Sequence, residues 1–115
     1  MINKKAVGDI GEKIAVEYLK TKGYKIVECN GKYAGVELDI VAKDKNTLVF
    51  CEVKTRTDVL FGRPVEAVNR AKQLRYIQGA KGYIVTHKIK NTDIRFDVIE
   101  VLSDEINHLI NAFEC

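Results

Sequence analysis

Residues 36–56, VELDIVAKDKNTLVFCEVKTR, constrain the fold of this chain more than any other stretch. Two runs rich in Val, Leu, Ile and Phe flank the polar segment DKNT, a pattern that predicts an antiparallel β-hairpin. Charged residues are unusual inside such runs, because they are rarely buried without a partner. Here four of them interrupt the apolar sequence: Glu37, Asp39, Glu52 and Lys54. A hairpin that carries three acids and an amine points to a functional site.

The spacing of these residues predicts that they meet across the hairpin. A two-residue turn at 45–46 would place Asp39 opposite Glu52 and Glu37 opposite Lys54. Directly opposed residues have Cβ atoms about 4.5–5.5 Å apart. Any even-numbered loop without a bulge leaves all four side chains on one face of the sheet. An odd-numbered loop would separate the two pairs.

Two carboxylates at this distance repel each other unless a proton or a cation lies between them. Hard carboxylate oxygens, without histidine or thiolate, favour Mg²⁺ or Mn²⁺ over zinc. A lysine two residues beyond one ligand is placed to hold a phosphate oxygen or the attacking water. Asp39, Glu52 and Lys54 thus form a minimal set for metal-assisted phosphodiester hydrolysis.

A structural role is the alternative for the same residues. Glu37 and Lys54 would then form a cross-strand ion pair, and the other two acids would be exposed to solvent. The neighbouring residues argue against open solvation, because alternation places Val41, Leu48 and Phe50 on the acids' face.

An amphipathic helix is predicted before the hairpin, over residues 7–24, where Gly23 supplies a stop. A short strand over 24–30 follows and is closed by the turn residues Asn30 and Gly31. The expected buried stripe of the helix contains Ile10, Ile14, Ala15, Tyr18 and Leu19.

A second helix is predicted over 64–81, after a loop at 55–62, with Pro64 as its first residue. Strands are predicted over 82–87 and 93–101. The expected buried residues of the second helix are Val68, Ala71 and Leu74, with Ala67 and Gln78 beside them.

A last short helix is predicted after these strands, capped by Ser103 or Asp104. Its face would pack on the sheet, and it is also the candidate surface for a homodimer. The apolar residues of this face are Ile106, Leu109, Ile110 and Phe113.

Length and composition fit one α/β domain. The chain has 115 residues, of which 46% are apolar and 30% charged, enough for one modest core. The element order predicts a mixed sheet flanked by helices, with the hairpin central. No apolar run approaches the roughly 18 residues of a membrane span, and residues 1–13 lack a signal peptide. We therefore expect a cytoplasmic protein without a membrane partner.

The cysteines and histidines argue against zinc chemistry. Cys29, Cys51 and Cys115 are too far apart in sequence for a zinc knuckle or a redox pair. His87 and His108 have no partner at ligand spacing. A reducing compartment is expected, with the first two cysteines as small core residues.

Charge gives only weak evidence for a nucleic-acid partner, since the net value is +3. Basic residues cluster between Lys54 and Arg75. Within this cluster, Arg56, Lys72 and Arg75 are candidates for contacts with backbone phosphates. A solvated helix face is the alternative interpretation.

At Asp39 and EVK (52–54) the sequence resembles the PD-(D/E)xK nuclease superfamily. More closely, it is similar to the YraN family of small predicted endonucleases, which is related to archaeal Holliday-junction resolvases. Five segments carry this resemblance in order: GDIGEKIAVEYLKTKGYKIVECN, ELDIVA, VFCEVKTR, FGRPVEAVNRAKQLR and RFDVIEV.

The resemblance implies a single domain over 1–115, with an αβββαβ restriction-endonuclease-like core plus a C-terminal strand and short helix. It implies that Asp39 and Glu52 are ligands of Mg²⁺ or Mn²⁺, with the Val53 carbonyl as a third. Lys54 would be the catalytic lysine. Glu12 matches the glutamate that the related resolvases carry on their first helix.

One departure concerns the residues before Asp39. The family pattern has Gly-Gly-Glu there, whereas this chain has Gly35, Val36 and Glu37. Glu37 remains a candidate catalytic residue. The missing second glycine would alter how closely a substrate approaches.

Two functions are left open. The first is a metal-dependent endonuclease that hydrolyses DNA phosphodiester bonds, with branched or single-stranded DNA as candidate substrates. The second is a nucleic-acid-binding module of the same fold with weak or no cleavage. The complete set of Asp39, Glu52 and Lys54 favours an enzyme, because a pure binding module does not require it.

Overall fold

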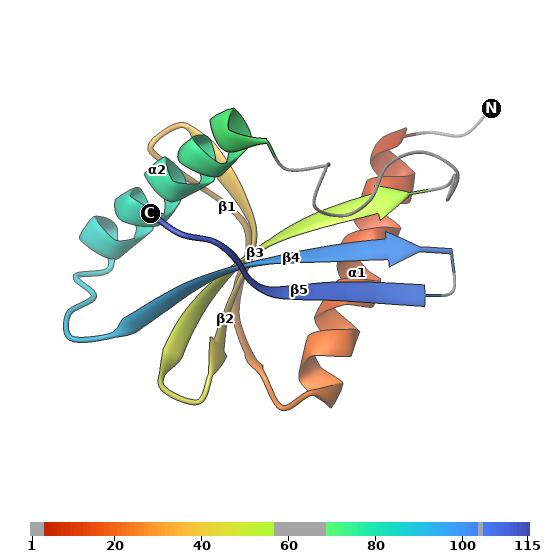
Figure 1. The fold of residues 1–115 in the computed structure, drawn as a ribbon, viewed down its shortest axis with the longest axis horizontal. Helices are drawn as coiled ribbons and strands as arrows, with labels where there is room; N and C mark the ends of the chain where they lie inside the picture. Colours follow the sequence, from red (N-terminus) through yellow and green to blue (C-terminus); the bar gives the residue numbers. More distant parts are fainter. Residues whose placement is uncertain (1–3, 57–68, 104) are drawn as a thin grey trace.

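The computed structural model describes residues 4–56, 69–103 and 105–115. It contains a twisted sheet with one helix on each face (Figure 1). Along the chain the elements follow the order αβββαββ. This order contains the predicted αβββαβ core. No helix in the described ranges is long and apolar enough to cross a membrane. The elements are α1 (Lys4–Thr21), β1 (Lys25–Tyr33), β2 (Val36–Asp44), β3 (Thr47–Arg56), α2 (Arg70–Thr86), β4 (Asp93–Leu102) and β5 (Glu105–Phe113).

The sheet is mixed, as predicted, and its strand order is β1-β2-β3-β4-β5. Strands β3 and β4 are parallel, whereas the other neighbours are antiparallel. Parallel strands require a crossover connection, and α2 lies in the segment that joins β3 to β4. The predicted hairpin therefore supplies the central strand, β3.

The two helices cover opposite faces of the sheet, which follows from the alternation of side chains along β3. Val49 and Cys51 pack in the cluster that contains residues of α1, whereas Leu48 and Phe50 pack in the cluster that contains residues of α2. Each face of β3 is therefore covered, and its apolar run is continuous for this reason.

The buried stripe of α1 differs from the prediction. Ile10 and Ile14 are 59% and 37% exposed, whereas Ala15 and Leu19 are fully buried. Gly11 lies one turn before Ala15 and is also buried. The helix thus packs on the sheet through small residues, which permit a closer approach than an isoleucine stripe would.

Helix α2 begins later than predicted. Asn69 is extended, with φ −80° and ψ 170°, and its side chain caps the helix by accepting from the Lys72 N–H at 3.0 Å. Pro64, the predicted first residue, and Val68 lie outside the described residues. Ala71 and Leu74 are exposed. The buried residues of α2 are Tyr76, Ile77, Gly79, Ala80 and Tyr83.

The strand predicted over 82–87 is wrong, because residues 82–86 are the last part of α2 and His87 is its C-cap. Its β-branched and aromatic residues gave a strand pattern, but tertiary packing overrides propensity here. The Tyr83 ring contacts the rings of Phe50 and Tyr33 edge-on, with centroid distances of 5.6 and 5.1 Å.

The first strand is longer than predicted. Asn30 and Gly31 do not close it, since β1 continues to Tyr33 and the turn lies at Ala34 and Gly35. Asn30 nevertheless has a left-handed backbone, with φ 59°, inside the strand. This irregularity lies beside the candidate site.

The predicted C-terminal helix is also wrong. Residues 105–113 form β5, which pairs antiparallel with β4. Ser103 has a left-handed φ of 43° before the strand, and Asp104 lies outside the described residues. The apolar helical face that was the candidate dimer surface therefore does not form. Phe113 is buried and stacks on Phe96, while Ile110 is exposed.

Candidate functional site

The hairpin has the predicted register at its turn end. Residues 45–46 form the turn, and the paired residues run from Asp44↔Thr47 to Ile40↔Cys51. The described pairing ends there. Asp39 and Glu52 come next on their strands but are not ladder partners. The two strands therefore open at the position of the carboxylates.

Side chains replace the ladder bonds at this opening. The Val53 N–H donates to Asp39 Oδ2 at 2.8 Å. The Asp39 N–H donates to the Tyr76 hydroxyl oxygen at 3.0 Å, and this hydroxyl donates to the Cys51 carbonyl at 2.6 Å. Asp39 is thus bonded through both its side chain and its backbone.

The predicted alternation along β2 fails at the same point. Leu38 packs in the α2 cluster and Ile40 in the α1 cluster, although alternation placed them on one face. On β1, the residues that pair with Leu38 and Ile40 flank the left-handed Asn30. The side chains of both strands switch from one face of the sheet to the other here. The alternation counted from the turn therefore predicts the face of a side chain only as far as Ile40.

Asp39 and Glu52 are nevertheless brought together. They line one pocket of about 250 Å³, beneath the first turns of α2. Lys54 Nζ lies 3.3 Å from Glu52 Oε1. The lysine therefore pairs with Glu52, whereas the sequence predicted a pair with Glu37. The lining residues are Val36, Glu37, Asp39, Glu52, Lys72, Arg75 and Tyr76.

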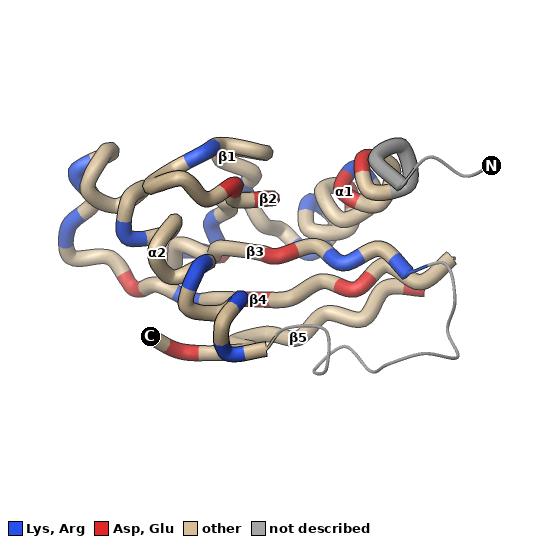
Figure 2. Tube along the Cα trace, turned by 90° about the horizontal axis from the view of Figure 1, so that it is seen from above, with Lys and Arg blue, Asp and Glu red and all other residues tan. Residues whose placement is uncertain are grey.

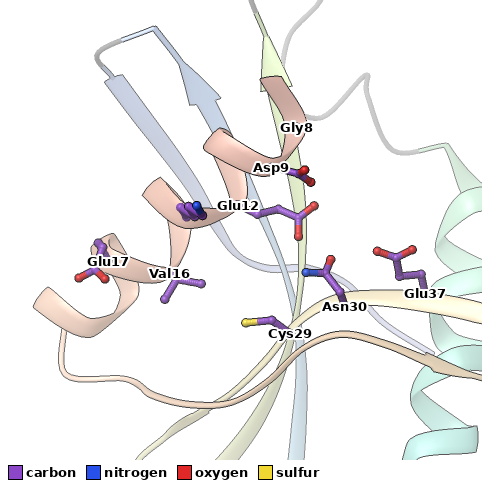
Figure 3. A pocket seen from close by; sticks show the side chains of 9 residues that line it. Gly8, Asp9, Glu12, Val16, Glu17, Cys29, Asn30 and Glu37 are labelled. Atoms are coloured by element: carbon purple, nitrogen blue, oxygen red, sulfur yellow. The ribbon is translucent and has the colours of Figure 1, made fainter. Parts of the chain in front are cut away.

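A larger cleft of about 1050 Å³ lies between α1 and the first two strands. Figure 3 shows Glu12 projecting from α1 toward Asn30, with Glu37 beyond it on β2. Glu37 lines both this cleft and the smaller pocket. Glu37 therefore connects the two cavities.

Electrostatics link Asp39 to the three other acids. Burial raises the pKa of Asp39 to about 7, although the hydrogen bond from the Val53 N–H opposes this shift. The negative charges of Glu12, Glu52 and Glu37 raise it further. The three other predicted carboxylates thus all act on Asp39.

The pKa of Glu12 is raised as well. Burial is the main cause, a hydrogen bond with the Asn30 side chain opposes it, and the charges of Glu37 and Asp9 add to it. The position of Glu12 depends on the preceding residue, Gly11, because a side chain there would overlap that of Thr55 on β3.

Two lysines, Lys54 and Lys72, lie near Glu52. The hydrogen bond with Lys54, and then its positive charge, lower the pKa of Lys72. Arg75 is near Lys72 on α2 and lines the same pocket. In Figure 2, acidic and basic positions lie side by side along β3, with further basic positions on α2.

Arg56, the remaining predicted phosphate contact, is held elsewhere. Its Nε donates to Glu100 Oε2 at 2.7 Å, and the Glu100 side chain is only 2% exposed. This pair was not predicted from the sequence. Charged residues inside the apolar run DIRFDVIEV were the signal that could have indicated it.

The chemistry of the oxygen donors fits a hard divalent cation only in part. Glu52 Oε2 is buried and has no hydrogen-bond partner in the described structure, as expected for an oxygen that awaits a ligand. Val53, whose carbonyl is the third predicted ligand, follows Glu52 directly. However, no three acids, histidines or cysteines of the described residues already gather at metal-binding distance.

A second polar network was not predicted. Asp97 is fully buried on β4 and accepts from Arg95 Nε at 2.9 Å. His108 Nε2 lies 2.7 Å from the other Asp97 oxygen, and the Tyr18 hydroxyl lies 3.0 Å from His108 Nδ1. The partners hold the pKa of Asp97 low against the effect of its burial. This network joins α1, β4 and β5.

The cysteines divide between core and surface. Cys51 is fully buried, as predicted, whereas Cys29 is exposed and lines the larger cleft. Cys115 is exposed as well.

Comparisons with known proteins place the chain among close relatives. The sequence model described as "Uncharacterised protein family UPF0102" matches residues 11–101. A UPF0102 protein of Caldanaerobacter subterraneus is 48% identical over 119 aligned residues, which cover 97% of this chain and 98% of the relative. A UPF0102 protein of Clostridioides difficile is 47% identical, and the alignment covers 97% of this chain and 100% of the relative. One of Chlorobium limicola is 42% identical, with 94% and 92% covered.

Proposed function

The chain belongs to the protein family UPF0102, the YraN family, and from this premise and the site geometry we propose that it is a metal-dependent DNA endonuclease. It would hydrolyse phosphodiester bonds, with branched or single-stranded DNA as candidate substrates. One observation carries the proposal: Asp39 and Glu52 share a pocket, beside two lysines and with one Glu52 oxygen unpartnered.

The predicted ligands would hold Mg²⁺ or Mn²⁺ as follows. Asp39 and Glu52 supply carboxylate oxygens, and the Val53 carbonyl supplies a third oxygen. A cation bound there neutralises the scissile phosphate and lowers the pKa of a water molecule. A cation held by these oxygens would offset the repulsion from the neighbouring acids, which adds to the effect of burial on the pKa of Asp39.

The other residues would act on the substrate. Lys54 stabilises the negative charge that develops on the phosphoryl oxygens, and it is held beside Glu52 at 3.3 Å. Lys72 and Arg75 contact neighbouring backbone phosphates, since both line the same pocket. Glu12 and Glu37 line the larger cleft, and their negative charges, which already act on Asp39, would favour a cation at the site.

Cleavage is tested with labelled linear duplex, single-stranded, flapped and four-way DNA, each with Mg²⁺, Mn²⁺ or EDTA. Metal-dependent cleavage of at least one substrate is expected, and Asp39→Asn should abolish it while the protein remains folded. Glu52→Gln should behave likewise. Cleavage by both variants at the wild-type level would indicate a contaminating nuclease and contradict the proposal.

A nucleic-acid-binding module is the second candidate. The open arrangement of the acids favours it, because in the described residues three ligand side chains are not yet gathered at metal-binding distance. This candidate predicts salt-dependent DNA binding that EDTA does not change and no cleavage of any substrate. A homodimer, with one site for each strand, remains a proposal for the enzyme.

A further inference from the structure

The opening between β2 and β3 requires an explanation, since ladder pairing stops one residue before both carboxylates. If the register continued, Leu38 would pair with Val53. Instead, the Val53 N–H is bonded to the Asp39 carboxylate at 2.8 Å. A further contact must keep β2 and β3 from continuing their ladder, because continued pairing would take the Val53 N–H away from the Asp39 carboxylate.

We propose that Tyr76 is the residue that holds this opening and thereby positions Asp39 against Glu52. Its hydroxyl accepts from the Asp39 N–H at 3.0 Å and donates to the Cys51 carbonyl at 2.6 Å. One side chain thus bridges the backbones of both strands next to the carboxylates. The meaning of this bridge for catalysis rests on the proposed function.

The bridge and the Asp39 carboxylate together tether the backbone on both sides of Glu52. Cys51 is bonded to Tyr76, and Val53 is bonded to Asp39. Without the hydroxyl, the Asp39 N–H and the Cys51 carbonyl would lose the hydrogen bonds that Tyr76 makes to them. The strands would then gain by pairing with each other, which would displace Asp39.

The packing of α2 brings Tyr76 into reach. Gly79 lies one turn later, and a Cβ there would come within 2.9 Å of Leu38 and 3.0 Å of Val36. The helix therefore lies directly on β2. Lys72 lies four residues before Tyr76 and thus on the same face of α2. The same helix therefore positions the acids and the second lysine.

Tyr76 acts through Asp39 and does not react itself. Tyr76 is only 5% exposed. Its hydroxyl already accepts one hydrogen bond and donates another within the protein. Burial holds its pKa well above the ordinary value, so the hydroxyl keeps its proton and continues to donate.

The test compares Tyr76→Phe with Tyr83→Phe. Tyr83 lies on the same buried side of α2 and contacts Phe50 through its ring, so its variant controls for the loss of a hydroxyl. Three quantities are measured below both melting temperatures: amide hydrogen exchange by NMR without metal, Mn²⁺ affinity by calorimetry, and DNA cleavage.

In Tyr76→Phe we expect the Asp39 and Val53 amides to exchange at least about tenfold faster, with Val49 and Ala42 unchanged. Mn²⁺ affinity should fall by about 10- to 100-fold, as for the loss of other groups that orient metal ligands. Tyr83→Phe should show neither effect. If Tyr76→Phe left Asp39 exchange unchanged, or raised exchange uniformly, the positioning role would be overturned.

The same measurements separate this inference from the proposed function. A wild type that neither binds Mn²⁺ nor cleaves DNA would refute the endonuclease, whereas selective exchange at Asp39 in Tyr76→Phe would still support the bridge. If the wild type binds Mn²⁺ and the variant binds it equally well, Tyr76 does not position the carboxylates.

Discussion

Asp39 is the residue at which burial, hydrogen bonding and charge act against one another. Burial and three neighbouring acids raise its pKa to about 7, and the hydrogen bond from the Val53 N–H opposes this rise. Near neutral pH a proton and a cation therefore compete for the same carboxylate. Perturbed carboxyl groups of this kind are typical of functional sites.

The first prediction concerns stability and pH. The pKa of Asp39 is raised from 3.8 to about 7 on folding, so the folded chain keeps the proton that the unfolded chain loses. Its stabilising effect is complete below about pH 4 and is lost as the pH rises to about 7. Asp39→Asn should therefore melt above the wild type without metal, by roughly 5 °C at pH 8.

Thermal melts at pH 5 and pH 8 measure this effect. The advantage of the variant should be larger at pH 8, and Mn²⁺ should raise the melting temperature of the wild type only. Glu37→Gln is the control, because Glu37 is exposed and its variant should stay within about 0.5 kcal/mol. An advantage equal at both pH values would show that Asp39 is not protonated in the folded chain.

The second prediction separates the lysine from the acids. Lys54→Ala should abolish cleavage but leave Mn²⁺ affinity equal or slightly higher, because a positive charge beside Glu52 is removed. Calorimetric Mn²⁺ titration and a cleavage assay check this. If Lys54→Ala instead lowered only the melting temperature, and Mg²⁺ changed no property of the wild type, the charged residues would have a structural role.

At the scale of elements, the site depends on how closely the helices approach the strands. The α1 approach is made at Gly11, where a Cβ would overlap the Thr55 side chain. The α2 approach is made at Gly79, on Val36 and Leu38. Small residues therefore determine how far Glu12 and Tyr76 lie from the carboxylates.

The third prediction tests the α1 approach. Gly11→Ala should move α1 away from β3, lower the melting temperature and reduce Mn²⁺ affinity or cleavage by displacing Glu12. Gly8→Ala is the matched control, because among the described residues no atom apart from its neighbours in α1 lies within 4 Å of its added Cβ. That variant should stabilise the helix by about 0.5–1 kcal/mol. Equal stabilisation by both variants would refute the close approach.

At the scale of the whole molecule, the distribution of charge matters more than the net value of +3. Lys72 and Arg75 lie beside the acids, while Arg56 is bonded to the buried Glu100. In the proposed function, a DNA backbone at the carboxylates would therefore lie beside the basic residues of α2.

The fourth prediction is that DNA binding depends on phosphate contacts. Affinity should fall steeply between 50 and 200 mM salt and vary little with sequence. Lys72→Gln and Arg75→Gln should each reduce the salt slope by about one, whereas Lys43→Gln, next to the β2–β3 turn, should not. Fluorescence anisotropy in EDTA provides the measurement. Equal affinities at both salt concentrations would exclude this surface as the binding site.

The residues of the site could be predicted because their pattern is local. The turn at 45–46, the register as far as Ile40↔Cys51 and the position of acids within apolar runs all depend on short-range alternation. The same holds for β4 and for the existence of α1. Family membership follows from the same motifs, with the matched region spanning 11–101.

Tertiary structure decided the rest, because several segments were compatible with two conformations. Residues 82–87 have strand propensity but complete α2, since Tyr83 packs on Phe50. Residues 105–113 have helical spacing but form β5, which covers the edge of β4 that would otherwise be unpaired. The backbone at the face change is bonded, at Asp39, to the hydroxyl of Tyr76, 37 positions away in the chain. Such contacts join residues that are distant in sequence, so they cannot be predicted from local periodicity.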